Sequence, residues 1–450
     1  MLDELNVRGF WWIPGRKKHK VPGTLTFSQQ DGPKLSLLGS LDGTSALDAF
    51  ASRSFAENHK ALFGFSDNGK AVTLINCQLY TKTINIPGIP SVEAIVDYVF
   101  IGKHFRRIEE TIFKNMRVQY SGLDNWLNKT GFTINFDNMS KGKVSTYYKK
   151  PKDIRINLDG GLSLNINTAL APVSLSVPQK EVRLVQKAYA RFESRKHLSF
   201  EAFLGYSHHF QNFLILATRA PCYPLQLTLL HKSKSEISVY YRINANVSHS
   251  REVKPFEMLF DYSLIARNFR RSITTWYLKR ETIGPISELY FSTLRGNSMY
   301  SENRFLNLIQ GLEAYHRQFV RNQEFPRAKY EKRKLRVLKD LPDSLKQWVS
   351  SNLSNEPSLR SRLTELVTGK KSLLSRLVPD TDRFINTVVE TRRYYTHYSQ
   401  TKKRNVAKPH ELIHLIRPLT TLFEAVLLEE LGLPKKKLDE IFTRRRRFQG

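Results

Sequence analysis

The spacing of apolar residues changes near residue 250, and this change divides the chain into two parts with different predicted secondary structure. In the first part, short runs of alternating apolar and polar residues are interrupted by Gly, Pro and Asn, as in half-buried strands. The predicted strands are Thr24–Phe27, Lys34–Leu38, Ala71–Ile75, Thr133–Phe136, Ile154–Leu158, Leu162–Ile166 and Ile237–Tyr241. Helical spacing interrupts them at residues 200–217 and 256–279, so we expect a sandwich or barrel-like β domain with covering helices.

From Ser301 onward, apolar residues recur every three or four positions, as on one face of an amphipathic helix. The first such helix has Ser301 as its expected N-cap. Its apolar positions are Phe305, Leu308, Ile309, Leu312, Tyr315 and Phe319. Shorter helices are expected at residues 335–341, 345–353 and 359–367.

Two further long helices complete the predicted bundle. One follows Pro379, has Asp380, Thr381 and Asp382 as cap candidates, and carries the apolar positions Phe384, Ile385, Val388 and Val389. The other begins at Pro409 and runs towards Gly432. The fold class is therefore α+β and multidomain: a β-rich N-terminal domain over residues 1–285, and an all-α helical bundle over residues 286–450. A chain of 450 residues is long enough for two such cores.

The chain is strongly basic, with 71 Lys and Arg against 41 Asp and Glu and a formal charge of +30. Such a charge attracts polyanions, nucleic acid first and an anionic membrane surface second. Basic runs occur at residues 16–20, 435–437 and 444–447, either as solvated faces or as specific contacts. Two cysteines, no N-terminal leader and no apolar window near the length of a membrane helix predict a cytoplasmic protein that does not span a bilayer.

Two motif matches point to chemistry that the rest of the pattern does not favour. Residues 64–70 approach a phosphate-binding loop, but Ala71 stands where Ser or Thr is needed and a strand follows, so we interpret Asp67–Gly69 as a hairpin turn. His410-Glu411-x-x-His414 matches the zinc-peptidase motif, which places two imidazoles one helical turn apart. Its alternative is a helix start in which Glu411 favours the helix dipole.

An Arg-x(4 to 6)-His pair occurs at five of the twelve histidines, so the spacing alone decides nothing. Only Arg392 and His397 lie within a strong amphipathic helix. There Arg392 is expected to continue the buried stripe of Val388 and Val389, and a buried arginine needs a partner or a function.

These residues carry a resemblance to a known family. The run Phe384–Tyr398, with Arg392 and His397 in it, resembles the signature helix of the Apea-like HEPN domain, and residues 304–317 resemble that family's first long helix. The N-terminal segments 9–15, 23–26 and 37–39 are similar to the opening of the β-rich domain of ApeA-like antiphage proteins. Arg393 departs from the pattern, because family members usually have Asn, His or Asp there.

The resemblance implies an antiphage, abortive-infection endoribonuclease that needs no metal or other cofactor. Arg392 and His397 are its catalytic residues, with Arg393, Tyr398 and Glu313 in support. The expected reaction is attack of a ribose 2′-OH on the adjacent phosphate, which leaves a 2′,3′-cyclic phosphate and a 5′-OH. The implied substrate is cellular RNA, with tRNA among the candidates.

The residues around this helix suggest how RNA is held and how the protein assembles. The expected RNA-binding residues are Tyr394, Tyr395, Lys402, Lys403 and Arg404, of which the tyrosines are equally compatible with ordinary packing. HEPN domains typically pair, so we expect a homodimer. By analogy, the N-terminal domain is a sensor or regulator that responds to a phage-derived trigger.

Two alternatives from other functional classes stay open. In the first, the HEPN domain is a catalytically silent RNA-binding or dimerisation module, in which Arg392 pairs with His397 or with a carboxylate such as Glu313. In the second, His410, Glu411 and His414 form a zinc site and the protein is a metallopeptidase. The identity of the RNA and of the trigger is not encoded in any recognisable motif.

Overall fold

The computed structural model describes residues 4–28, 30–42, 56–83, 89, 91–136, 142–172, 174–175, 180–230, 236–243, 252–295, 299–397 and 405–448. The chain divides into two compact units, Met1–Arg270 and Arg271–Gly450, and the division falls within helix α5 (Phe269–Leu278). The boundary expected between residues 285 and 286 falls within α6 (Arg280–Arg295), and the functional division of the chain there stays a prediction.

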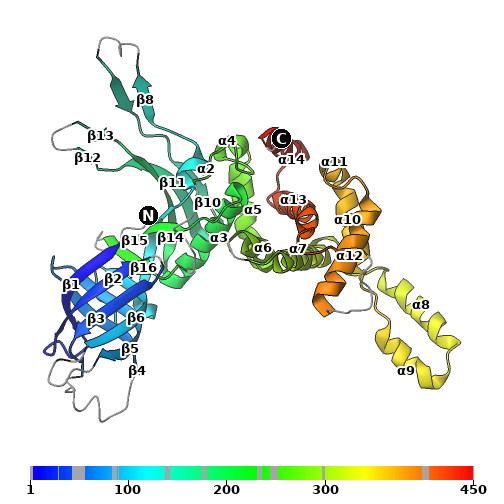
Figure 1. The fold of residues 1–450 in the computed structure, drawn as a ribbon, viewed down its shortest axis with the longest axis horizontal. Helices are drawn as coiled ribbons and strands as arrows, with labels where there is room; N and C mark the ends of the chain where they lie inside the picture. The colour runs from blue at the N-terminus through cyan, green and yellow to red at the C-terminus, as the bar shows by residue number, and fades with distance from the viewer. Residues whose placement is uncertain are drawn as a thin grey trace. The chain divides into compact units, whose positions relative to one another are not determined.

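The N-terminal unit begins with a closed antiparallel barrel (Figure 1). Its six strands are β1 (Leu5–Trp12), β2 (Val21–Ser28), β3 (Gly32–Leu38), β4 (Ala56–Ser66), β5 (Ala71–Thr83) and β6 (Ser91–Ile101). They follow the order β6-β3-β2-β1-β4-β5, and β5 pairs with β6 to close the barrel. Alternate residues of each strand point inward, because side chains alternate across a strand. The barrel core includes Trp11, Leu25, Leu35, Leu62, Val72 and Leu74.

A second half of the same sheet continues from β6 through strand β16. Its strands are β7 (Ile112–Tyr120), β10 (Ile154–Asn157), β11 (Leu162–Leu170), β14 (Gln186–Ser199), β15 (Pro224–Leu230) and β16 (Glu236–Tyr241), in the order β10-β11-β14-β7-β15-β16. The long helix α3 (Phe200–Thr218) packs on β14 and β7. Ser199 caps α3 by accepting a hydrogen bond from the backbone N–H of Ala202 at 3.2 Å.

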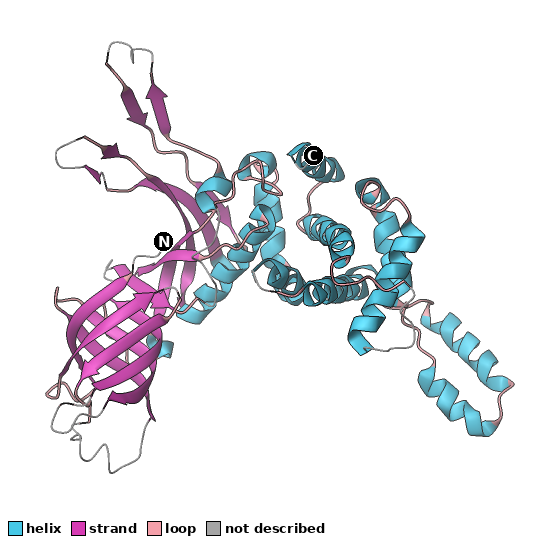
Figure 2. Cartoon of the chain, viewed as in Figure 1, coloured by secondary structure: helices cyan, strands magenta, loops and turns pink. Residues whose placement is uncertain are grey.

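Smaller elements complete the N-terminal unit. Two separate two-stranded pairs join β8 (Phe132–Asn135) to β9 (Ser145–Tyr148) and β12 (Ser174–Leu175) to β13 (Val182–Arg183). The short helical elements are η1 (Ile108–Glu110), α2 (Leu123–Leu127), η3 (Asp159–Gly161) and α4 (Tyr262–Ile265). Figure 2 shows that most of this unit is strand, with few helices beside the sheet.

The strands and the hairpin turn predicted for this unit are confirmed. Each of the seven predicted strands overlaps a strand of the structure, although those ending at Phe136 and Leu158 extend one residue too far, and the helix predicted over residues 200–217 is α3. The segment 256–279 is less regular than its spacing suggested, since only α4 and α5 are helical there. The turn that follows Ser66 is a hairpin turn: the Ser66 N–H donates to the Lys70 carbonyl at 3.0 Å, and Gly69 has φ +75°.

The C-terminal unit is helical, with α7 (Ser301–Tyr315) packed against α6, α10, α12 and α13. Its other elements are the π-helix η5 (His316–Val320), α8 (Arg327–Lys339), α9 (Asp343–Asn352), α10 (Leu359–Gly369), α11 (Lys371–Leu374), α12 (Thr381–His397), α13 (Leu412–Glu430) and α14 (Lys435–Phe448). Buried apolar side chains of α7, α10, α12 and α13 meet in its core, among them Phe305, Leu312, Leu363, Val388 and Leu419. The predicted helical bundle is confirmed.

Helix starts are the least accurate part of the prediction. Ser301 is the first residue of α7 rather than its cap, because Tyr300 occupies the N-cap and makes no capping side-chain bond. Asp380 does cap α12, since its Oδ1 accepts the Arg383 N–H at 2.9 Å. Helix α13 begins at Leu412, three residues after the predicted Pro409. Among the described residues, none of the helices has the length and the apolar content needed to cross a membrane.

Candidate functional site

Helix α12 faces the bundle through a stripe that differs from the predicted one. Its buried residues are Ile385, Val388, Thr391 and Tyr395, spaced three or four apart. Arg392 therefore lies beside the stripe, with 39% of its side chain exposed, and the expectation that it continues the buried stripe is wrong. Threonine takes the inward position instead. The guanidinium is consequently accessible to a ligand from solvent.

The partner of Arg392 is Glu313 of α7. Arg392 Nη2 lies 3.9 Å from Glu313 Oε2, and the carboxylate side chain is 26% exposed. At this distance and exposure the pair is a weak ion pair, which contributes at most about 1 kcal/mol. Glu313 thus orients the arginine without consuming its capacity to bind a phosphate.

His397 is the last residue of α12, and its side chain is exposed. A separation of five residues places Arg392 and His397 about 140° apart around an ideal helix. Arg393, which is also exposed, lies four residues before His397 and therefore shares its face. The three side chains surround the end of the helix, and within one chain they do not converge on one face.

Two residues of the buried stripe tie this end of α12 to the chain that returns after it. The Thr391 hydroxyl accepts the N–H of Ala407 at 3.0 Å, and the Tyr395 hydroxyl donates to the Ala407 carbonyl at 3.3 Å. Tyr395 is 8% exposed, so its ring packs in the interior, as the packing alternative expects. Tyr394 is partly exposed, and its ring centroid lies 5.2 Å from that of Tyr395. The other expected site residues, Tyr398, Lys402, Lys403 and Arg404, lie outside the described residues.

A buried polar network follows α7 and was not anticipated from the sequence. His316 has no exposed surface, and its Nε2 lies 2.9 Å from Glu365 while its Nδ1 accepts from Arg362 at 3.1 Å. Because an arginine donates only, the Glu365 contact must be the one that uses the imidazole N–H. The signals in the sequence were a histidine within the apolar stripe that ends at Phe319 and an arginine among the apolar positions of residues 359–367.

Arg362 is the centre of this network, with 1% of its surface exposed. It donates to the backbone carbonyls of Pro357 and Arg321, each at 3.1 Å, and to the side-chain oxygen of Asn322 at 3.2 Å. Glu365 also pairs with Arg321, which with the hydrogen bond from His316 lowers the pKa of this carboxyl to about 2. The network satisfies its buried charge with both carboxylate and carbonyl oxygens, as buried charges require.

The zinc-like motif occupies the start of α13. Glu411 is the N-cap residue, its carboxylate accepts the Lys408 backbone N–H at 2.8 Å, and that bond lowers the pKa of the carboxyl. His410 precedes the helix, so the two histidines are not presented together on one helical face. Among the described residues, no group of three or more His, Cys, Asp and Glu could hold a metal ion. The geometry at Glu411 is that of a helix start.

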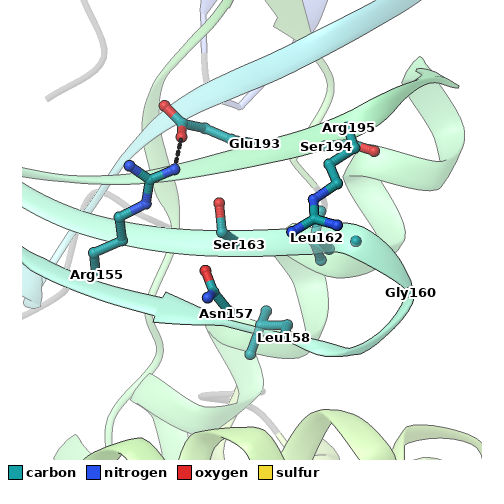
Figure 3. A pocket seen from close by; sticks show the side chains of 10 residues that line it. Arg155, Asn157, Leu158, Gly160, Leu162, Ser163, Glu193, Ser194 and Arg195 are labelled. Atoms are coloured by element: carbon teal, nitrogen blue, oxygen red, sulfur yellow. Dashed lines mark hydrogen bonds and ion pairs between the residues drawn. The ribbon is translucent and has the colours of Figure 1, made fainter.

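A polar pocket of about 410 Å³ lies on the N-terminal unit, between β10, β11 and β14 (Figure 3). Its lining includes two arginines, Arg155 and Arg195, and the serines Ser163 and Ser194. Arg155 Nη2 pairs with Glu193 Oε2 at 3.4 Å. The pocket is a polar recess, and no sequence motif in the N-terminal unit indicates which ligand it would bind.

Two family models match the chain. The model described as ApeA N-terminal domain 1 matches residues 6–276, which is more than half of the chain, and the model described as Apea-like HEPN matches residues 306–437. No curated protein and no solved structure matches it. The second model begins within α7 and covers the chain through α13, so it includes Glu313, Arg392 and His397.

Proposed function

The chain belongs to the ApeA-like antiphage-defence proteins that carry a C-terminal HEPN domain, and on this premise we propose that it is a metal-independent endoribonuclease. The observation that supports this most directly is the position of Arg392 and His397 at the accessible end of α12, inside the segment that matches the HEPN model. HEPN domains commonly dimerise and bind RNA. The proposed substrate is cellular RNA, with tRNA among the candidates.

In the proposed mechanism, the neutral imidazole of His397 takes the proton from a ribose 2′-OH. The 2′ oxygen then attacks the adjacent phosphorus, and the bond from phosphorus to the 5′ oxygen breaks. Arg392 stabilises the negative charge that develops on the phosphate oxygens. The leaving 5′ oxygen takes up the proton that His397 accepted, returned directly or through water, so the products are a 2′,3′-cyclic phosphate and a 5′-OH.

A homodimer supplies the convergence that one α12 lacks. Because Arg392 and His397 point about 140° apart on one helix, a substrate phosphate reaches both more easily if two helices face each other. Arg393 shares the His397 face and adds a second cation there. We propose that Arg392 of one chain and His397 of the other act on the same phosphate. The N-terminal domain is proposed to restrain this site until a phage-derived trigger binds.

The test is cleavage of total cellular RNA by the purified full-length protein in EDTA, with and without an extract of phage-infected cells. The wild-type protein is expected to produce discrete cuts with 2′,3′-cyclic phosphate ends. The variants His397→Ala and Arg392→Ala are expected to lose them, by a factor of roughly 100 or more. Mapping the new 5′ ends identifies the RNA.

The matched control is His414→Ala, which removes another exposed imidazole of the same unit and belongs to the zinc-like motif. It is expected to cut RNA as the wild type does. Cuts that persist in His397→Ala, or intact RNA with and without the infected-cell extract, would overturn the proposal. RNA that binds equally to wild type and His397→Ala but is never cut would favour the silent binding module.

A further inference from the structure

Helices α8 and α9 form a hairpin arm, residues 327–352, whose residues contribute nothing to the buried core. The two helices pack on each other, and neither contains a buried residue. Figure 1 shows the arm, in yellow, leading away from the other helices of its unit. Large apolar side chains are exposed on it, such as Leu335 at 68% and Trp348 at 66%. Two helices that bury no core residues add little to the stability of the fold, so we expect their role to lie in binding.

The arm carries unbalanced positive charge. Residues 327–352 contain eight basic and three acidic residues, and seven of the basic ones lie on α8. The seven are Arg327, Lys329, Lys332, Arg333, Lys334, Arg336 and Lys339. In the part of the chain that the structure describes, none of these seven forms an ion pair with a carboxylate. Arg333 instead lies over the ring of Phe325, 3.9 Å from its centroid.

The arginines beside the arm form ion pairs with carboxylates, unlike the seven basic residues of α8. Arg317 lies 2.7 Å from Glu356, and Arg321 pairs with both Glu324 and Glu365. Carboxylates therefore pair with the arginines at the base of the arm, whereas the one carboxylate on α8, Glu331, forms no ion pair with the seven cations of this helix among the described residues. Cations left without counter-charges along a helix about 20 Å long are suited to a polyanion that supplies them.

The base of the arm is fixed by hydrogen bonds across its two ends. Asn355 holds both backbone groups of Phe325, through its Oδ1 at 3.0 Å and its Nδ2 at 2.8 Å. The Tyr330 hydroxyl donates to the Leu353 carbonyl at 2.9 Å. The buried Arg362 also holds the Arg321 carbonyl, just before the arm begins. These bonds join the two ends of the arm to each other and connect the segment before it to Arg362 of α10.

The same helix connects the arm to the candidate site. Glu313 contacts Arg392, and His316 of the buried network lies three residues later, at the start of η5, which continues α7. Three residues advance a helix by about 4.5 Å. Glu313, which contacts the proposed catalytic arginine, and His316, which belongs to the network at the base of the arm, therefore lie about one turn apart on one helical run that ends at Val320.

We infer that the α8–α9 arm is an RNA-binding surface that holds the substrate through its phosphates. This inference rests on the proposed function, because the arm would be the surface through which the proposed nuclease binds its RNA substrate. A second copy of the chain is a poor occupant, since two arms of the same charge repel each other. Phosphate contacts of this kind give affinity without sequence preference, and their strength falls steeply with salt. Trp348 offers an exposed ring on which a base can stack.

The experiment measures binding of fluorescently labelled bulk tRNA to the full-length His397→Ala protein, so that cleavage does not interfere. Lys332 and Arg336 are exposed and lie on one face of α8, four residues apart. The double variant Lys332→Glu/Arg336→Glu is expected to raise the Kd by roughly tenfold or more. The slope of log Kd against log salt concentration is expected to fall by the amount that about two phosphate contacts contribute. The control Lys17→Glu/Lys18→Glu makes the same charge change in the N-terminal unit and is expected to alter the Kd by less than about twofold.

Circular dichroism of the arm variant excludes unfolding as the cause of any change. An equal loss of tRNA affinity in the arm variant and in the control variant would overturn the inference, because affinity would then depend on net charge alone. Unchanged tRNA binding together with a shift from dimer to monomer in sedimentation would overturn it in favour of self-association. Loss of binding in the arm variant of a protein that never cuts RNA would uphold the arm and reject only the proposed nuclease.

Discussion

The guanidinium of Arg392 on α12 lies 3.9 Å from the carboxylate of Glu313 on α7. The contact is long and solvated, so it positions the arginine and leaves it free to bind a phosphate. Glu313 could have either of two roles in catalysis: it could orient Arg392 through this weak ion pair, or it could itself transfer a proton. The proposed mechanism uses the first.

Glu313→Gln is expected to leave stability almost unchanged and to lower the KM for RNA by about two- to fivefold, because Arg392 no longer shares its charge with a carboxylate. The measurement is steady-state cleavage in EDTA together with a thermal melt. Glu302→Gln is the control, since it removes one carboxylate from the same helix. A fall in kcat of about 100-fold in Glu313→Gln would instead make Glu313 a proton carrier.

Arg362→Met is expected to lower the free energy of unfolding by about 3 to 5 kcal/mol, because it leaves buried oxygen acceptors and the His316 ring without their donor. The carbonyls of Pro357 and Arg321 lose their hydrogen bonds at the same time. Urea denaturation measures the change. Arg360→Met, at an exposed position of the same helix, is expected to cost less than about 0.5 kcal/mol. Similar values for the two variants would show that the network is not structural.

The stability of the protein is expected to fall in acid partly through Glu365. The Arg321 guanidinium and the His316 ring lower the pKa of this carboxyl from 4.5 to about 2. A carboxyl whose pKa is lower in the folded state stabilises the fold above its unfolded pKa, and this contribution is lost as the pH falls from about 4.5 to about 2. Glu365→Gln is therefore expected to flatten that part of the curve of stability against pH. An unchanged slope between these pH values would contradict the assignment.

Gly311→Ala is expected to destabilise the helical unit by about 1 to 3 kcal/mol, since a Cβ there would lie 2.4 Å from Cε2 of Phe423 on α13. Gly284 is the matched control. It lies inside α6, and a Cβ there would meet nothing within 4 Å. Gly284→Ala is expected to stabilise by about 0.5 to 1 kcal/mol, because alanine loses less backbone entropy in a helix. Thermal melts of the two variants should therefore move in opposite directions.

The sequence alone indicated a β-rich part followed by a helical part, seven of the strands, and the residues proposed for the candidate site. Alternation in stretches such as Leu162–Ile166 and the three-to-four spacing from Phe305 to Tyr315 are local signals, and they appear in the structure as β11 and α7. The motif of Arg392 and His397 is also local. Its resemblance to a known domain is upheld by the family model that covers it.

Tertiary packing decided what no local pattern contains. The inward position on α12 belongs to Thr391, because its hydroxyl meets the returning backbone at Ala407, and Arg392 is displaced to the edge beside Glu313. The closure of the barrel through β5 and β6, and the burial of Arg362 beside His316, join residues distant in sequence. Periodicity reports which side of an element is apolar, whereas partners across elements depend on how the elements pack. For this reason the sequence could propose the residues of the candidate site, and only the fold assigned their contacts.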